Sequence, residues 1–212
     1  MATLNFDRAQ PGWQFWLLWM GASIAGVIVL YGLVFSVIIY VLSALVPMQQ
    51  IQNTAPGQQW TGIVIGLFSF AAIGAAIGAA QWLVLRRYVR GAGWWVLATM
   101  IGYGVPLVAG PLLSFRKPPW LAGVSMFLTF GVILGILQWL TLRGRVYQAG
   151  WWVAISILGW LAAYALAGVA IVSGLYVEPF DLLAAFFVPV AVAGAGIIWL
   201  LRQSALIIQA AG

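Results

Sequence analysis

Cysteine and histidine are both absent from the 212 residues, and only Asp7, Glu178 and Asp181 are acidic. Without cysteine there are no disulfides and no thiol catalysis, and without histidine most zinc, haem and chlorophyll sites lose their usual ligand. Paired carboxylates, a nucleophile with a neighbouring base and a metal-ligand set are all missing from the sequence. We therefore expect no enzyme, no catalytic residue and no metal site.

Charge is scarce altogether, because 6% of the residues are charged, 65% are hydrophobic and the mean hydropathy is +1.08. This composition excludes a soluble domain. The formal charge is +6 and the isoelectric point is about 10.2, which would ordinarily indicate nucleic acid. Here the positive charges occupy short gaps between apolar runs, as in loops that set membrane topology. We expect membrane lipids, and no nucleic acid, as partners.

The apolar runs predict an all-α fold, a polytopic transmembrane bundle of about six spans. The whole chain, 1–212, would be one transmembrane domain, with spans at about 14–46, 60–86, 93–114, 119–142, 149–176 and 180–201. The first run is uncharged and too long for a signal-peptide core. As a helix it would measure about 50 Å, against about 30 Å of hydrocarbon. It must therefore tilt, break or protrude, and we expect Trp13, Trp16 and Trp19 at headgroup depth.

Positive charges at alternate ends of these spans predict the orientation. Only Arg116 and Lys117 fall on one side, and seven of the nine fall on the other: Arg8, Arg86, Arg87, Arg90, Arg143, Arg145 and Arg202. The positive-inside rule places those seven in the cytoplasm. We therefore expect a multi-pass protein of the inner, or intracytoplasmic, membrane with both termini cytoplasmic.

An internal repeat appears when the chain is aligned with itself at an offset of 57 residues. Residues 74–102 match residues 131–159 at 14 of 29 positions without a gap. Each unit reads as a helix ending in QWLxLR, a short basic loop and a helix beginning AGWWV, which predicts a helical hairpin. Two helices per unit give a direct repeat rather than the inverted repeat of many transporters. The string GIIWLLR, at 196–202, is a candidate for a decayed third copy.

A small and polar face recurs in the first helix of each unit. Gly74, Gly78 and Gln81 are spaced at i, i+4 and i+7, and Gly131, Gly135 and Gln138 repeat that spacing. Such a face favours helix packing, with the amides as interhelical hydrogen-bonding groups. The alternative is that Gln81 and Gln138 line a cofactor site for a lipid headgroup, a quinone or the magnesium of a chlorophyll-type pigment.

Aromatic and basic residues gather at the predicted cytoplasmic ends of the spans. We interpret them as interface anchors, since indole and arginine favour the headgroup region: Arg86, Arg143, Trp82, Trp94, Trp95, Trp139, Trp151 and Trp152. A cofactor-stacking role for some of these indoles is an alternative where the doubled tryptophan leaves one ring facing the bundle.

At the QWLxLR and AGWWV strings the chain resembles uncharacterised bacterial membrane proteins with tandem copies of this hairpin, associated chiefly with photosynthetic bacteria. The resemblance covers 74–102 and 131–159, and it implies an environment but no activity.

Three functions remain at this point. The favoured one is a non-catalytic subunit or scaffold that packs against other subunits of a larger membrane complex, photosynthetic or energy-transducing. The alternatives are a small-molecule transporter or channel, and a pigment, quinone or lipid-binding membrane protein.

Overall fold

The computed structural model describes residues 11–30, 32, 36, 40, 56–114, 118–174 and 180–210, and within them all regular secondary structure is helical. Helices longer than one turn in those residues are α1 (Trp13–Leu30), α4 (Pro56–Leu85), α5 (Trp94–Ser114), α6 (Pro119–Leu142), α7 (Trp151–Val172) and α8 (Phe180–Ala210). These residues contain no strand, and the predicted all-α class is confirmed.

Within the described residues, four helices are long and apolar enough to cross a membrane, at Gly66–Leu85, Trp120–Leu142, Trp151–Ala170 and Phe186–Ile207. The apolar part of α1, Trp13–Ile28, is shorter, and most of the predicted run to residue 46 lies outside the described residues. The membrane character is thus supported, and the number of six spans stays a prediction.

Three helix ends differ by four or more residues from the sequence-based boundaries. Helix α7 ends at Val172 instead of residue 176. Helix α4 begins at Pro56 instead of residue 60, since proline is well tolerated at the first helical position. Helix α8 continues to Ala210 instead of ending near 201. Arg202 and the polar residues after it do not break a helix, and the Ser204 hydroxyl donates a 2.9 Å hydrogen bond to the Leu200 carbonyl.

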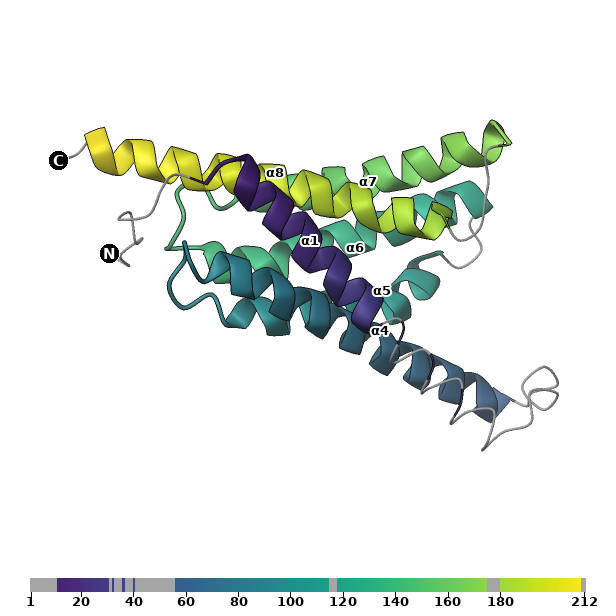
Figure 1. Cartoon of the computed structure of the whole chain (residues 1–212). Coiled ribbons are helices and arrows are strands. Elements are labelled where there is room, and N and C mark those ends of the chain that lie inside the picture. Colours follow the sequence, from purple (N-terminus) through teal and green to yellow (C-terminus); the bar gives the residue numbers. More distant parts are fainter. Residues whose placement is uncertain are drawn as a thin grey trace.

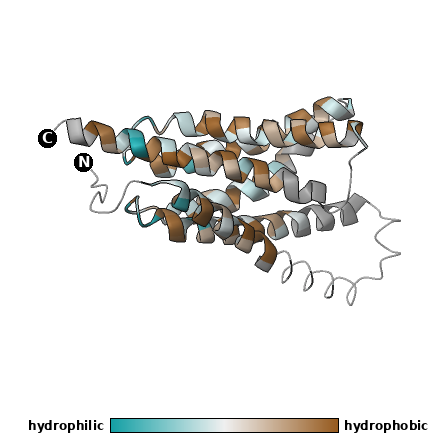
Figure 2. Cartoon of the chain, turned by 45° about the horizontal axis from the view of Figure 1, so that its top comes forward, coloured by the Kyte–Doolittle hydropathy of each residue, from teal (hydrophilic) through white to brown (hydrophobic). Residues whose placement is uncertain are grey.

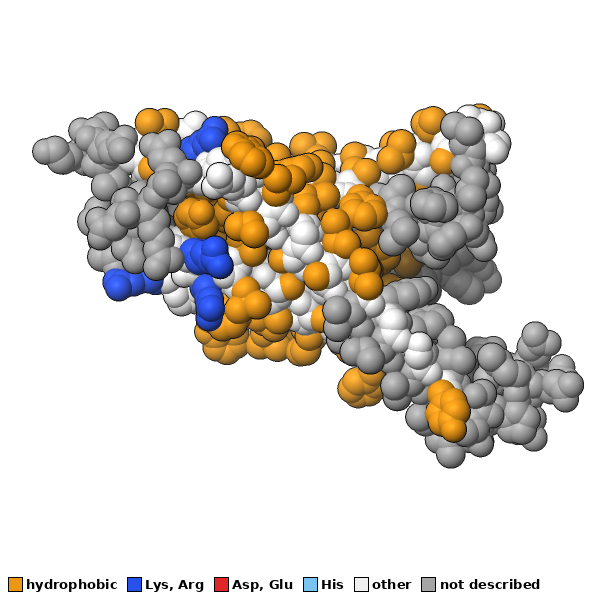
Figure 3. Space-filling view, viewed as in Figure 1, with side chains coloured by type: hydrophobic (Ala, Val, Ile, Leu, Met, Phe, Trp, Pro, Cys, Tyr) orange, Lys and Arg blue, Asp and Glu red, His pale blue; other side chains and the backbone are white. Residues whose placement is uncertain are grey.

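The described helices form a closed ring. Helices α4 to α8 each contact the next in the chain, and α1 contacts both α4 and α8 (Figure 1). The beginning of α1, the end of α8 and the turns after α4 and α6 all lie at one end of the bundle. This end also carries the hydrophilic residues in Figure 2 and the Lys and Arg side chains visible in Figure 3. We call it the basic end, and its cytoplasmic placement stays a prediction.

The two turns at the basic end share a backbone hydrogen bond and one left-handed position, although Gly144 of the second turn also has positive φ and its repeat partner Arg87 does not. Val89 N–H donates to Leu85 at 2.9 Å, and Val146 N–H donates to Leu142 at 3.0 Å. Gly91 and its repeat partner Gln148 both have positive φ, +72° and +53°. Left-handed backbone is natural for glycine but strained for glutamine, so the second turn keeps its shape against the preference of its residue.

Candidate functional site

The two repeated glutamines lie inside the bundle and make the same hydrogen bond. Gln81 is 5% exposed and Gln138 is 4% exposed. The Trp95 indole N–H donates to Gln81 Oε1 at 2.9 Å, and the Trp152 indole N–H donates to Gln138 Oε1 at 3.1 Å. Each amide oxygen therefore joins the two helices of its own unit.

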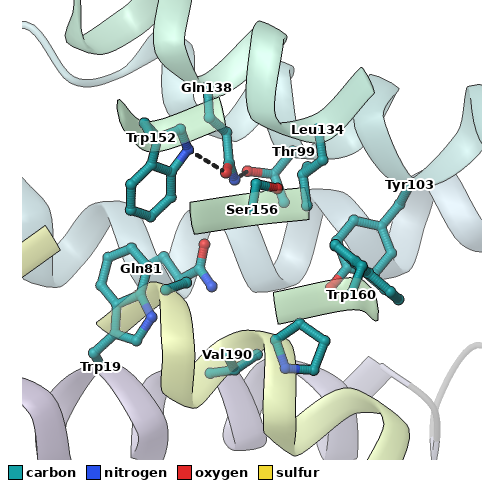
Figure 4. Close-up of a pocket in the computed structure, with 12 residues that line it drawn as sticks. Trp19, Gln81, Thr99, Tyr103, Leu134, Gln138, Trp152, Ser156, Trp160 and Val190 are labelled. Carbon is teal, nitrogen blue, oxygen red and sulfur yellow. Dashed lines mark hydrogen bonds between the residues drawn. The ribbon is translucent and has the colours of Figure 1, made fainter. Parts of the chain in front are cut away.

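The amide nitrogens point the other way around the ring, to a hydroxyl on the preceding helix. Gln81 Nε2 donates to Ser23 Oγ of α1 at 3.0 Å. Gln138 Nε2 donates to Thr99 Oγ1 of α5 at 3.0 Å, as Figure 4 shows. Both ends of each amide are thus bonded within the protein. A cofactor at either glutamine would have to compete with these bonds.

Four glycines on the same helix faces as the glutamines allow the close approach that these hydrogen bonds require. We call them the stripe glycines: Gly74, Gly78, Gly131 and Gly135. A Cβ atom at Gly74 would lie 2.7 Å from the Thr99 carbonyl oxygen, and one at Gly78 would lie 2.8 Å from Thr99 Cβ. In the second unit, a Cβ at Gly131 would lie 2.7 Å from Ile157 Cα, and one at Gly135 would lie 3.0 Å from Ser156 Cβ. Any larger residue would push the two helices of the hairpin apart.

The doubled tryptophans divide between surface and interior. Trp94 and Trp151 are 65% and 57% exposed, and their anchoring role stays a prediction. Trp95 and Trp152, expected among the interface anchors, are fully buried with ring centroids 5.4 Å apart. Successive helical residues point about 100° apart, so only one ring of each pair can face the same side.

The remaining predicted anchors also occur as equivalent pairs. The Arg86 guanidinium lies 5.2 Å from the centre of the half-buried Trp82 ring. Arg143 lies 5.8 Å from the Trp139 ring in the same way. Both cations are exposed at the basic end, where an indole face attracts them.

Helix α1 contributes a third set of residues that the sequence analysis missed. Trp19, expected at headgroup depth, is completely buried, with its ring centroid 5.8 Å from that of Trp95. The Ser23 hydroxyl donates to the Trp19 carbonyl, as the Thr99 hydroxyl does to the Trp95 carbonyl. A signal was present in the spacing Trp-x3-Ser/Thr-x2-Gly, which occurs at Trp19–Gly26, Trp95–Gly102 and Trp152–Gly159.

The last glycine of this spacing aligns the three helix pairs. A Cβ at Gly26 would lie 3.1 Å from Ile77 Cα, one at Gly102 3.1 Å from Leu134 Cα, and one at Gly159 3.2 Å from Pro189 Cα. The three contacts make Ile77, Leu134 and Pro189 equivalent positions on α4, α6 and α8. The ring is therefore three helix pairs, α4–α5, α6–α7 and α8–α1.

Helix α8 differs from α4 and α6, the first helices of the other two pairs, at the position of the glutamine. Four residues after Ile77 and Leu134 come Gln81 and Gln138, but four residues after Pro189 comes Ala193. The string at 196–202 is therefore not the structural counterpart of QWLxLR. Phe186 and Val190 occupy the positions of the stripe glycines, and a cavity of about 120 Å³ lies between α1 and α8.

No turn joins α8 to α1 in this third pair, but their ends are still held together at the basic end. The Arg202 side chain donates from Nε to the Pro11 carbonyl at 2.9 Å. Trp16 Nε1 also donates to the Ala191 carbonyl at 3.1 Å. These two bonds link the beginning of α1 to α8, as the covalent turns link the other pairs.

Comparisons with protein-family models, curated proteins and solved structures find no match to this chain.

Proposed function

We propose that this protein is a non-catalytic membrane subunit or scaffold, which packs against a helix of a larger membrane complex. The interior supports this proposal, because the buried amides of Gln81 and Gln138 are already hydrogen-bonded to the indoles of Trp95 and Trp152. Many hydrophobic side chains of the described residues are exposed, aromatic rings among them, and Figure 3 shows hydrophobic side chains spread over one face of the molecule.

Two equivalent grooves near the basic end carry the proposal further. One lies between α5 and α6, has a volume of about 250 Å³ and includes Trp94, Leu137 and Leu140. The other lies between α7 and α8 and has a volume of about 680 Å³. Trp151 corresponds to Trp94 by the repeat, so the two grooves occupy the same place on successive pairs.

The larger groove differs from the smaller one because the residues that α8 contributes to it are smaller than those that α6 contributes to the other groove. Val192, Ala195 and Gly196 of α8 occupy the places that Leu137, Leu140 and Thr141 occupy on α6. Small residues let another helix approach closely, which is the usual basis of association within a membrane. We therefore place the partner helix in the α7–α8 groove, against the exposed rings of Trp151 and Trp199, which contact each other with centroids 6.4 Å apart.

The partner belongs to a photosynthetic or energy-transducing complex in this proposal. The resemblance of the QWLxLR and AGWWV strings supports that environment. In this proposal the protein lies in the inner or intracytoplasmic membrane. The basic end and both termini face the cytoplasm, because seven of the nine positive charges fall on that side of the predicted spans.

Photo-crosslinking in the native membrane tests the site. A benzophenone amino acid at Ala195 should capture another membrane protein, and the same group at the equivalent Leu140 should capture mainly lipid. Ala195→Leu recreates the α6 residue at an exposed position and should release the co-purifying subunit while the fold is retained. Equal capture of lipid alone at both positions would refute the scaffold proposal.

A further inference from the structure

The third helix pair contains a buried hydrogen-bond donor without an acceptor. Trp19 Nε1 is the one buried side-chain nitrogen or oxygen that lacks a hydrogen-bond partner among the described residues. Trp95 and Trp152, its equivalents, donate to Gln81 and Gln138. A third glutamine, at the position of Ala193, would supply the missing acceptor.

A cavity of about 30 Å³ lies at this place. Its walls include Trp19, Ala193 and Ser156, together with both glutamines (Figure 4). Ser156 follows Trp152 by four residues, as Thr99 follows Trp95, and it is 7% exposed. The Ser156 hydroxyl thus stands where it would accept the amide N–H of a third glutamine. The cavity therefore has an indole donor and a hydroxyl on its walls. In the other two helix pairs a glutamine amide bridges the same two groups.

The volume identifies the class of ligand. A cavity of roughly 10–15 Å³ holds one water molecule, whereas a cavity that binds benzene has a volume of about 150 Å³. A quinone ring, a lipid headgroup or a chlorin is therefore too large for this space. Water also suits the chemistry, because it can accept from an indole and bond to a hydroxyl at once.

We propose that this cavity is a binding site for one or two water molecules, which replace the missing third glutamine amide. The water accepts a hydrogen bond from Trp19 Nε1 and bonds to the Ser156 hydroxyl, completing a threefold set of tryptophan, polar bridge and hydroxyl. The ring thereby keeps its third indole inside the bundle without an unsatisfied donor.

Magnetic resonance on the unmodified protein provides the first test. In detergent micelles with ¹⁵N-labelled tryptophan, the Trp19 indole proton should show a cross-peak to a long-lived water molecule, and Ala193→Gln should abolish it. Trp19→Phe identifies the resonance. An indole proton without any water contact, or a contact to detergent or lipid instead, would overturn the proposal.

Stability provides the second test, with variants matched in size. Ala193→Gln should increase the folding equilibrium constant about fivefold to tenfold over Ala193→Leu, as two buried interhelical hydrogen bonds imply. In a Trp19→Phe background, where one of the two bonds is lost, this ratio should fall to about twofold to threefold. An equal gain from Leu and Gln would mean that the site is a dry, apolar void. Because the cross-peak is measured on the native sequence, the first test decides even if Ala193→Gln or Ala193→Leu misfolds.

Discussion

Replacing Gln138 by leucine should destabilise the bundle through one specific donor. Leucine has a similar size but no polar atom, so Trp152 Nε1 loses its acceptor inside the protein. Thr99 loses less, because its hydroxyl still donates to the Trp95 carbonyl at 2.7 Å. The unpaired indole should therefore account for most of the effect.

The size of the effect follows from these two losses. The hydrogen bond to Thr99 contributes about 0.6 kcal/mol, the average for such bonds in membranes. A buried donor without a partner costs about 1–3 kcal/mol. We expect Gln138→Leu to lower the free energy of unfolding by about 2 kcal/mol, and Gln81→Leu to lower it by a similar amount.

Reversible unfolding in mixed micelles, followed by tryptophan fluorescence and circular dichroism, measures this loss. Leu158→Ala, at a 62% exposed outer position, is the control and should change stability little. A double-mutant cycle with Trp152→Phe should give a coupling of about 1 kcal/mol, since Phe removes the orphaned donor. Wild-type stability for Gln138→Leu, or no coupling to Trp152, would refute the role of the amide as an interhelical bridge.

Three further predictions concern the glycines, the turns and the orientation. Gly131→Ala should destabilise by about 1–3 kcal/mol, since its Cβ would meet the α7 backbone, and Gly168→Ala, with open space around it, should stabilise by up to about 1 kcal/mol in the same unfolding assay. Gln148→Gly should stabilise by about 1 kcal/mol by relieving a positive φ, and a lower unfolding midpoint would contradict this. In intact cells an impermeant maleimide should label Lys117→Cys but not Arg90→Cys, and the reverse pattern would invert the proposed topology.

The sequence was sufficient for the features that repeat with a fixed spacing. Two glycines and a glutamine at i, i+4 and i+7 must lie on one helix face, and an amide in hydrocarbon needs a partner. Gln81 and Gln138 are indeed buried on the face that meets the next helix. Their partners were not predictable, because an adjacent pair such as Trp94 and Trp95 offers two rings and the sequence does not say which one turns inward.

The third helix pair was beyond the sequence for a different reason. Helix α1 keeps only Trp19, Ser23 and Gly26 of the pattern, which are too few identities to stand out in a chain rich in tryptophan and glycine. Helix α8 has lost the glutamine altogether. Only the close contacts of Gly26, Gly102 and Gly159 align the pairs, and these contacts join residues far apart in the chain.

The residues that differ from the repeat pattern lie mainly on α8, which indicates that two sides of this helix have separate roles. Sequence positions that break an otherwise consistent pattern are where function is expected. On α8, Ala193 faces the ring interior beside Trp19, and Ala195 faces the outer groove beside Trp151. The two residues lie two positions apart, so they point to different sides of the helix. Ala193 variants should therefore change stability and bound water without changing partners, while Ala195 variants should change partners without changing stability. If variants at both positions changed both properties together, α8 would act as a single packing element, and the assignment of separate roles to Ala193 and Ala195 would be wrong.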